Sequence, residues 1–299
     1  MEIKIFNLFA VSELYELELL LAKCNLENNF VSGWIICEND YSLRGTYKGE
    51  HSFRKAIWSD KRFEPFLDKI HIIEMSFKYE CKEGIDDFTV IYKQRDIEQY
   101  AVQQLANDED IIIISDLDEM INFTNPEAIK IITKPVVENN LVCPIANWFI
   151  WDFDNLLGYS LETIRILTIK KLKEIQLNPQ LKLYHNLQMI RHLKPDIILK
   201  PEIPIAYHYH NCYPKIDIWR KFNTYGHTGF TEEYLDKMLK YNCSWGREIG
   251  SELTETNFLK GTVELTVQNS PLYIRENLER LRTNNINPDY ENLRKIDFY

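Results

Sequence analysis

The chain has 299 residues, of which 45% are hydrophobic and 13% aromatic, so it can bury a substantial core. This composition excludes a disordered chain. The formal net charge of −10 argues against broad binding to nucleic acid or anionic membranes, because phosphate backbones are held chiefly by clustered Lys and Arg. An anionic small ligand would therefore need local compensation, most simply by a divalent cation.

The sequence shows no segment typical of a membrane span or a signal peptide. Its most apolar N-terminal stretch, residues 14–22, is interrupted by Glu16 and Glu18 and lacks both a basic leader and a small-residue cleavage site. The six cysteines are scattered and form no Cys-x-x-Cys pair, so neither a zinc cage nor a dense disulfide scaffold is indicated. We therefore expect a cytoplasmic protein with reduced thiols.

The first third of the chain alternates between strand and helix patterns. In chain order, these patterns predict a strand at 2–9, a helix behind Ser12 as N-cap, a strand at 30–38, a helix at 52–59 and a strand at 70–73. Leu14, Leu17, Leu21 and Cys24 supply the helical spacing after Ser12. Such alternation favours an α/β fold.

A helix predicted at 92–106 leads into the most informative strand. Arg95 and Gln99 lie on one face of this helix, away from its apolar residues. Four consecutive isoleucines at 111–114 leave no polar face, as expected of a central parallel strand covered on both sides. Because ligands of open parallel sheets bind beyond the carboxyl ends of the strands, residues 115–119 are the predicted ligand-binding position.

The second half of the chain changes from strands to helices. After a helix that begins at Pro126, strands are predicted at 141–153, 162–170 and 196–209, as a mixed or antiparallel extension of the sheet. Beyond Pro214, helices are predicted around Ile218, at 232–241 and at 271–281. We thus predict a central, mostly parallel, Rossmann-related sheet flanked by helices in residues 1–213, with 214–299 as a helical C-terminal region packed on it.

The segment Asp116-Leu117-Asp118-Glu119 carries three carboxylates in four positions. Their mutual repulsion is costly unless a cation or hydrogen-bond donors neutralise them. A hard divalent ion, Mn²⁺ or Mg²⁺, takes oxygen ligands from carboxylates and phosphates and stabilises a departing diphosphate. The alternative is a solvated acidic turn that caps the next helix. The isoleucine run before the segment favours the metal site.

Several further segments accompany this motif in a fixed order along the chain. They are Phe6-Asn7 with the helix containing Glu13, Glu16 and Glu18, residues 34–48, 95–100, 108–119, 206–212, and Lys221, Phe222 and His227. In these segments the chain resembles glycosyltransferase family 17, whose members include β-1,4-N-acetylglucosaminyltransferases. The resemblance covers most of residues 5–230. It departs from the family pattern at Met120-Ile121, where Ile-Pro is usual, and at Tyr207, where Trp is expected.

The resemblance implies a GT-A nucleotide-sugar fold and an inverting transfer from a nucleoside-diphosphate sugar, a UDP-sugar, to a glycan or other hydroxyl acceptor. It implies that Asp116 lies near the ribose or the metal, that Asp118 binds the metal and that His208 is a second ligand. The residues support His208 independently, because His208 and His210 share one face of a strand and neutral imidazole binds Mn²⁺. A hydrogen-bonded structural histidine is the alternative, more so for His210.

Further residues are candidates for contacts with the donor and the acceptor. For the nucleotide sugar they are Glu38, Arg44, Lys48 and Arg95, with Arg54 as another cation; for the sugar or acceptor they are Glu119, Trp148, Trp151 and His227. An inverting transfer also needs a carboxylate base. Alternation in 148–154 predicts Asp152 and Asp154 on one strand face, as candidates for that base; the alternative is that they begin a turn.

Two other functions remain open from the sequence. A haloacid-dehalogenase-like phosphatase also places Asp-x-Asp after an apolar strand and would use Asp116 as its nucleophile. Its motif usually begins the domain, whereas here it lies mid-chain and continues with Glu119-Met120. A non-catalytic carbohydrate-binding relative would keep the fold without turnover, and the intact set of Asp116, Asp118, Glu119 and His208 argues against it.

Overall fold

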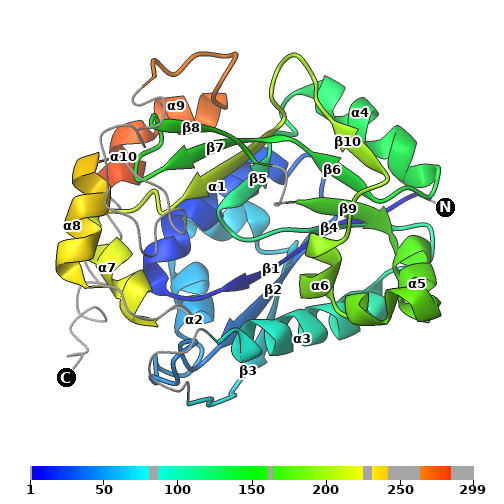
Figure 1. The fold of residues 1–299 in the computed structure, drawn as a ribbon, viewed down its shortest axis with the longest axis horizontal. Helices are drawn as coiled ribbons and strands as arrows, with labels where there is room; N and C mark the ends of the chain where they lie inside the picture. The colour runs from blue at the N-terminus through cyan, green and yellow to red at the C-terminus, as the bar shows by residue number, and fades with distance from the viewer. Residues whose placement is uncertain (1, 81–86, 161–163, 225–230, 242–262, 284–299) are drawn as a thin grey trace.

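The computed structural model describes residues 2–80, 87–160, 164–224, 231–241 and 263–283. Two sheets lie between layers of helices (Figure 1). The larger has seven strands in the order β10-β6-β9-β4-β1-β2-β3. Its strands are β1 (Ile5–Val11), β2 (Gly33–Asn39), β3 (Ile70–Met75), β4 (Ile111–Ile114), β6 (Val142–Pro144), β9 (Arg165–Thr168) and β10 (Ile197–Leu199).

The centre of this sheet is parallel and fully covered. β1 pairs in parallel with both β2 and β4, and β2 pairs in parallel with β3, whereas β9 runs antiparallel to β4 and β6. In β4, Ile111 and Ile113 face one hydrophobic cluster and Ile112 and Ile114 face another. An all-isoleucine strand is stable there because both its faces are removed from water.

Helices cover the two faces of the large sheet (Figure 1). The cluster with Ile111 and Ile113 is completed by α1 (Leu17–Glu27), α2 (Ser52–Ser59) and α4 (Pro126–Val137). The opposite cluster is completed by α3 (Thr89–Leu105), α5 (Ile169–Leu177) and α6 (Leu187–His192). The predicted α/β fold, with a mostly parallel central sheet flanked by helices, is therefore confirmed.

A second sheet of four strands lies against α1, in the order β5-β11-β7-β8. Its strands are β5 (Glu119–Ile121), β7 (Ala146–Ile150), β8 (Leu156–Ser160) and β11 (Ala206–His210). β5 begins one turn after β4 ends, so the acidic segment joins the two sheets. β11 lies between β5, antiparallel, and β7, parallel. This arrangement brings the strand with the two histidines beside the acidic segment.

The elements differ from the predicted ones mainly where prolines and caps intervene. The stretch 141–153 is not one strand: it breaks between Pro144 and Ala146 and supplies β6 to one sheet and β7 to the other. The predicted strand 162–170 ends at Thr168, whose side chain accepts a hydrogen bond from Lys171 N and starts α5. The stretch 196–209 likewise divides into β10 and β11.

The start of α1 also differs from the prediction. Ser12 is not the N-cap, because a 3-10 turn at Leu14–Glu16 precedes the helix. Glu13 is the N-cap of this turn. The Glu16 carboxylate closes this turn by accepting hydrogen bonds from Ser12 N and Glu13 N. α1 then begins at Leu17 and is buried on nearly all sides.

The described residues after Pro214 include helices, as the sequence predicted. They contain α7 (Lys215–Thr224), α8 (Glu232–Tyr241), α9 (Leu272–Glu276) and α10 (Leu278–Thr283), so the single helix expected at 271–281 is divided at Asn277. The apolar residues of these helices join the cluster that includes α1; they are Ile218, Phe222, Leu235, Met238, Ile274 and Leu281. The division of the chain at residue 213 stays a prediction.

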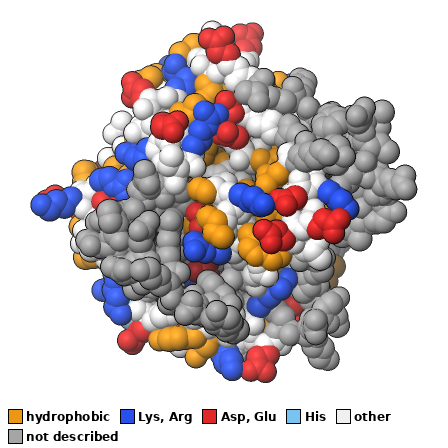
Figure 2. All heavy atoms as spheres, turned by 90° about the vertical axis from the view of Figure 1, so that its left-hand side faces the viewer, with side chains coloured by type: hydrophobic (Ala, Val, Ile, Leu, Met, Phe, Trp, Pro, Cys, Tyr) orange, Lys and Arg blue, Asp and Glu red, His pale blue; other side chains and the backbone are white. Residues whose placement is uncertain are grey.

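On the side that carries α7, α8 and α10, Lys and Arg alternate with Asp, Glu and hydrophobic side chains among the coloured residues (Figure 2). Positive charge on the described part of this face is therefore balanced locally. None of the helices in the described ranges combines the length and the hydropathy needed to cross a membrane.

The central strand supplies a test of the core. We expect Ile113→Ala to lower the free energy of unfolding by about 2–5 kcal/mol, because the removed side chain is completely buried and leaves a cavity. Ile198→Ala on β10, where the side chain is 50% exposed, is the matched control and should change it by about 0.5 kcal/mol or less. Urea denaturation followed by circular dichroism measures both. Equal effects of the two substitutions would contradict the proposed core.

Candidate active site

A buried lysine binds the backbone of the acidic segment Asp116–Glu119. Lys23 of α1 is completely buried, and its ammonium group donates hydrogen bonds to Ser115 Oγ at 3.0 Å, to Asp116 O at 3.3 Å and to Glu119 O. Glu27, one turn later on α1, balances the charge at 3.6 Å. Because a buried ammonium is costly without such partners, Lys23 fixes the backbone of the segment relative to α1.

Two arginines neutralise Asp116. Arg95 Nη2 of α3 lies 2.6 Å from Asp116 Oδ1, and Arg191 Nη1 of α6 lies 2.6 Å from Asp116 Oδ2. Loss of water around Asp116 would raise the pKa of its carboxyl, but Arg191 and Arg95 outweigh this effect and hold the pKa well below its usual range. The side chain is still 47% exposed, so Asp116 stays ionised and within reach of a ligand.

Glu119 is bound in the same network. Arg191 Nη2 lies 2.5 Å from Glu119 Oε1, and the Asp116 amide donates to Glu119 Oε2 at 2.8 Å. Burial raises the pKa of Glu119, although Arg191 opposes the shift. Arg191 thus clamps the first and last residues of the acidic segment. Sequence reasoning missed Arg191, because it lies far along the chain on a short helix without a motif.

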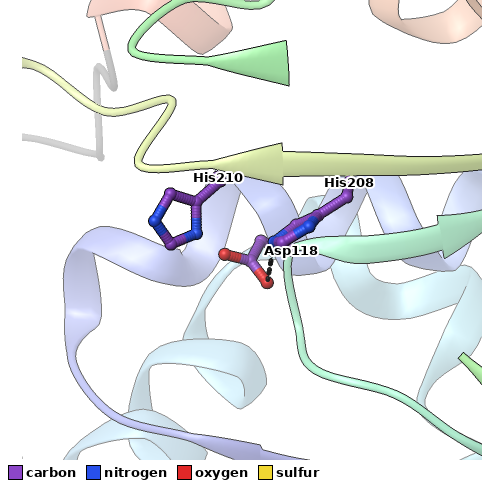
Figure 3. A group of neighbouring side chains, drawn as sticks. All are labelled: Asp118, His208 and His210. Atoms are coloured by element: carbon purple, nitrogen blue, oxygen red, sulfur yellow. Dashed lines mark ion pairs between the residues drawn. The ribbon is translucent and has the colours of Figure 1, made fainter. Parts of the chain in front are cut away.

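Asp118, His208 and His210 form a candidate metal centre (Figure 3). The two histidines come from one face of β11 and point toward Asp118, which precedes β5. One ligand atom from each residue lies within 4.8 Å of the other two, and His208 Nε2 is 3.8 Å from Asp118 Oδ1. Burial lowers the pKa of His208, which favours the neutral imidazole that a metal needs. One carboxylate and two imidazoles fit a divalent ion such as Mn²⁺.

The histidines are packed against an aromatic ring. Trp148 of β7 lies opposite His208 in the parallel register, and their rings stack at a centroid distance of 5.7 Å and an angle of 3°. His210 contacts the same indole edge-on at 6.2 Å. Lys221 of α7 lies on another side of the centre, with Nζ 3.8 Å from Asp118 Oδ2. The centre is therefore oriented by Trp148 and has a cation beside it.

These residues surround a cavity of about 560 Å³, within the range that binds small ligands. Its polar lining includes Ser12, Glu16, Lys48, Gln94, Arg95, Asp116, Asp118, Glu119, Ser160, Arg191, His208, His210 and Lys221; its apolar and aromatic lining includes Val11, Tyr15, Tyr41, Leu43, Ile91, Leu117, Trp148 and Tyr159. The cavity thus combines cations, carboxylates and aromatic surfaces at the carboxyl edge of β1 and β4.

The structure separates some predicted site residues from this cavity. Glu38 is buried, and its carboxylate accepts hydrogen bonds from Phe53 N at 2.6 Å and Arg54 N at 3.0 Å, so it holds the start of α2. Arg44 and Trp151 are not among the lining residues, and Arg54 pairs with Glu74 at the surface. His227 lies outside the described residues.

Asp152 and Asp154 do not lie on a strand face. β7 ends at Ile150, Trp151 has a left-handed φ of 66°, and Asn155 N donates to Asp152 O across a turn. Both aspartates pair with Arg282 of α10, at 2.8 Å and 2.6 Å, and neither lines the cavity. The strand-face interpretation was wrong, and the turn left open as its alternative is what forms.

The comparisons with known proteins show distant structural similarities. No protein-family model matches the chain, and no curated protein matches its sequence. Among solved structures, mannose-6-phosphate isomerase from Helicobacter pylori is similar at a TM-score of 0.36 and 13% identity, over 58% of this chain and 74% of that one. Mannose-1-phosphate geranyltransferase from Thermus thermophilus has a TM-score of 0.35 and 9% identity, over 70% of this chain and 74% of that one.

The galactosyltransferase LgtC, in complex with donor and acceptor sugar analogues, has a TM-score of 0.35 and 11% identity, over 76% of this chain and 84% of that one. All these TM-scores are below 0.5. The resemblance to glycosyltransferase family 17 receives no support from the comparisons.

The metal centre can be tested directly. We expect the purified chain to bind Mn²⁺, and both Asp118→Ala and His210→Ala to weaken that binding at least tenfold, because each removes one of three ligands. Isothermal titration calorimetry measures the affinity. His185→Ala, at an exposed histidine outside the cavity, is the matched control and should leave the affinity unchanged. If His210→Ala binds Mn²⁺ as tightly as the wild-type chain does, His210 is not a ligand of the metal.

Proposed function

We propose that the chain is a metal-dependent glycosyltransferase that moves a sugar from a nucleoside-diphosphate sugar to a hydroxyl acceptor. The observation that carries this proposal is the convergence of Asp118, His208 and His210 with the lining cations Lys48, Arg95, Arg191 and Lys221 in one cavity. A divalent ion and several cations within one site match the charge of a diphosphate. A net charge of −10 for the whole chain requires such a local arrangement.

Each group has a distinct part in the proposed reaction. A divalent ion held by Asp118, His208 and His210 would act as a Lewis acid toward the departing diphosphate. Lys221, 3.8 Å from Asp118, would bind a diphosphate oxygen, and Arg191 and Arg95 would keep Asp116 ionised beside it. Trp148 would provide an aromatic surface near the sugar. A UDP donor, a glycan acceptor and inversion at the anomeric carbon belong to the same proposal.

The phosphatase alternative is less well supported. Its nucleophile would be Asp116, but both oxygens of that carboxylate already face guanidinium groups at 2.6 Å. A guanidinium on each oxygen lowers the electron density available for attack on phosphorus. A generic aryl phosphate assay distinguishes the two enzymes, because only the phosphatase would release inorganic phosphate from it.

A thermal-shift screen tests the donor and the metal together. We expect UDP-N-acetylglucosamine, UDP-glucose or UDP-galactose to raise the melting temperature only when Mn²⁺ is present, and EDTA to reverse the shift. A ligand at 100 times its dissociation constant contributes about 2.7 kcal/mol to the native state. That gain corresponds to a shift of several degrees.

Asp118→Ala should abolish the Mn²⁺-dependent shift, whereas Glu127→Gln on the exposed side of α4 should keep it. UDP release measured with the stabilising donor then separates a transferase from a non-catalytic carbohydrate-binding protein. If no nucleoside-diphosphate sugar, including GDP-mannose, shifts the melting temperature with Mn²⁺, the proposed function is wrong.

A further inference from the structure

Four described carboxylates line the cavity: Glu16, Asp116, Asp118 and Glu119. If the proposed function holds, an inverting transfer needs one carboxylate to accept the proton of the acceptor hydroxyl. Such a group must reach the cavity and must have a free oxygen. These two requirements can be examined for each of the four side chains.

Three of the four carboxylates already bind arginines or belong to the candidate metal centre. Asp116 has one guanidinium on each oxygen, and Glu119 accepts from Arg191 on one oxygen and from the Asp116 amide on the other. Asp118 belongs to the candidate metal centre. The two aspartates that the sequence suggested as bases, Asp152 and Asp154, pair with Arg282 away from the cavity lining.

Glu16 meets both requirements. Its Oε2 accepts hydrogen bonds from Ser12 N at 2.5 Å and Glu13 N at 3.2 Å, which fix the carboxylate in one orientation at the cavity wall. Within the described ranges, no residue donates a hydrogen bond to its Oε1. We propose that Glu16 is the catalytic base, with Oε1 as the atom that accepts the proton of the acceptor hydroxyl.

In the proposed sugar transfer, Glu16 accepts the proton and the nucleoside diphosphate leaves. The proton of the acceptor hydroxyl moves to Glu16 Oε1 as the hydroxyl oxygen forms a bond to the anomeric carbon. The bond from that carbon to the diphosphate oxygen breaks, and its electron pair leaves with the nucleoside diphosphate. Lys221, beside Asp118, faces the charge that develops on the leaving group.

The surroundings of Glu16 give its activity a defined pH dependence. Burial raises the pKa of Glu16 to about 7, while the Ser12 amide and Lys221 of α7 oppose the shift and Asp118 adds to it. Tyr15 and Tyr213 also interact with Glu16, and both phenols stay neutral because burial raises their pKa. A base works in its ionised form, so turnover should rise as the pH passes through about 7.

Glu16→Gln tests the assignment, because the amide retains an oxygen for the Ser12 and Glu13 amides but cannot accept the proton. With UDP-N-acetylglucosamine, UDP-glucose and UDP-galactose as probes, Mn²⁺ present and water or free sugars as acceptors, we expect kcat for UDP release to fall about 100-fold or more. The pH-dependent rise near 7 should disappear. Binding of UDP with Mn²⁺, measured by calorimetry, and the melting temperature should stay close to the wild-type values.

Two variants serve as comparisons. Asp152→Asn tests the competing base and Glu127→Gln tests an exposed carboxylate; both should keep kcat within about threefold. Wild-type turnover with an equally active Glu16→Gln would overturn the assignment of the base alone, as would a large loss in Asp152→Asn. Loss of UDP binding together with turnover would show that Glu16 is a binding or structural residue. A wild-type chain that binds and turns over none of the probes would overturn the assignment together with the proposed function.

Discussion

The candidate site depends on how four carboxylates are kept together at one edge of a sheet. Placing Glu16, Asp116, Asp118 and Glu119 around one cavity is unfavourable unless cations lie among them. Lys23 supports the backbone from inside the protein, and Arg95 and Arg191 neutralise the side chains from the opposite layer of helices. The acidic segment is thus held between two helical layers, and this fixes the direction in which Asp118 points.

This arrangement assigns different tasks to neighbouring carboxylates. Asp116 and Glu119 use their oxygens to hold arginines, so they shape the segment and carry charge. Asp118 is left to face the histidines of β11. Glu16 arrives from a different part of the chain, at the turn after β1, where backbone amides bind only one of its oxygens. Residue type alone does not decide the task of a carboxylate; the partners on its two oxygens do.

The parts of the fold that follow from local patterns were predictable. The isoleucine run predicted β4 at its observed bounds, and the alternation of tyrosines and histidines in 207–210 placed both imidazoles on one face of β11. Arg95 could be found because it shares a helix face with Gln99 just before the acidic strand. These features depend on spacing within a few residues, which the sequence displays directly.

Other features depend on tertiary contacts that spacing does not encode. Arg191 meets Asp116 across 75 positions, and no motif marks it. The Glu38 carboxylate accepts hydrogen bonds from the first amides of α2, and no local pattern in the sequence reveals this contact. Asp152 and Asp154 depend on the left-handed residue Trp151 and on Arg282, 130 and 128 positions away. Local alternation predicted a strand where the backbone turns.

The acidic segment connects β4 of the larger sheet to β5 of the smaller one. Asp118 stands at the junction between the sheets, whereas His208 and His210 belong wholly to the smaller one. The backbone of Asp118 already accepts a hydrogen bond from Tyr209 N of β11, and a ligand bound by Asp118, His208 and His210 would add a side-chain cross-link at this junction. The rigidity of the smaller sheet would then be thermodynamically coupled to occupancy of the cavity, so that docking of the layers and recognition of the ligand reinforce each other.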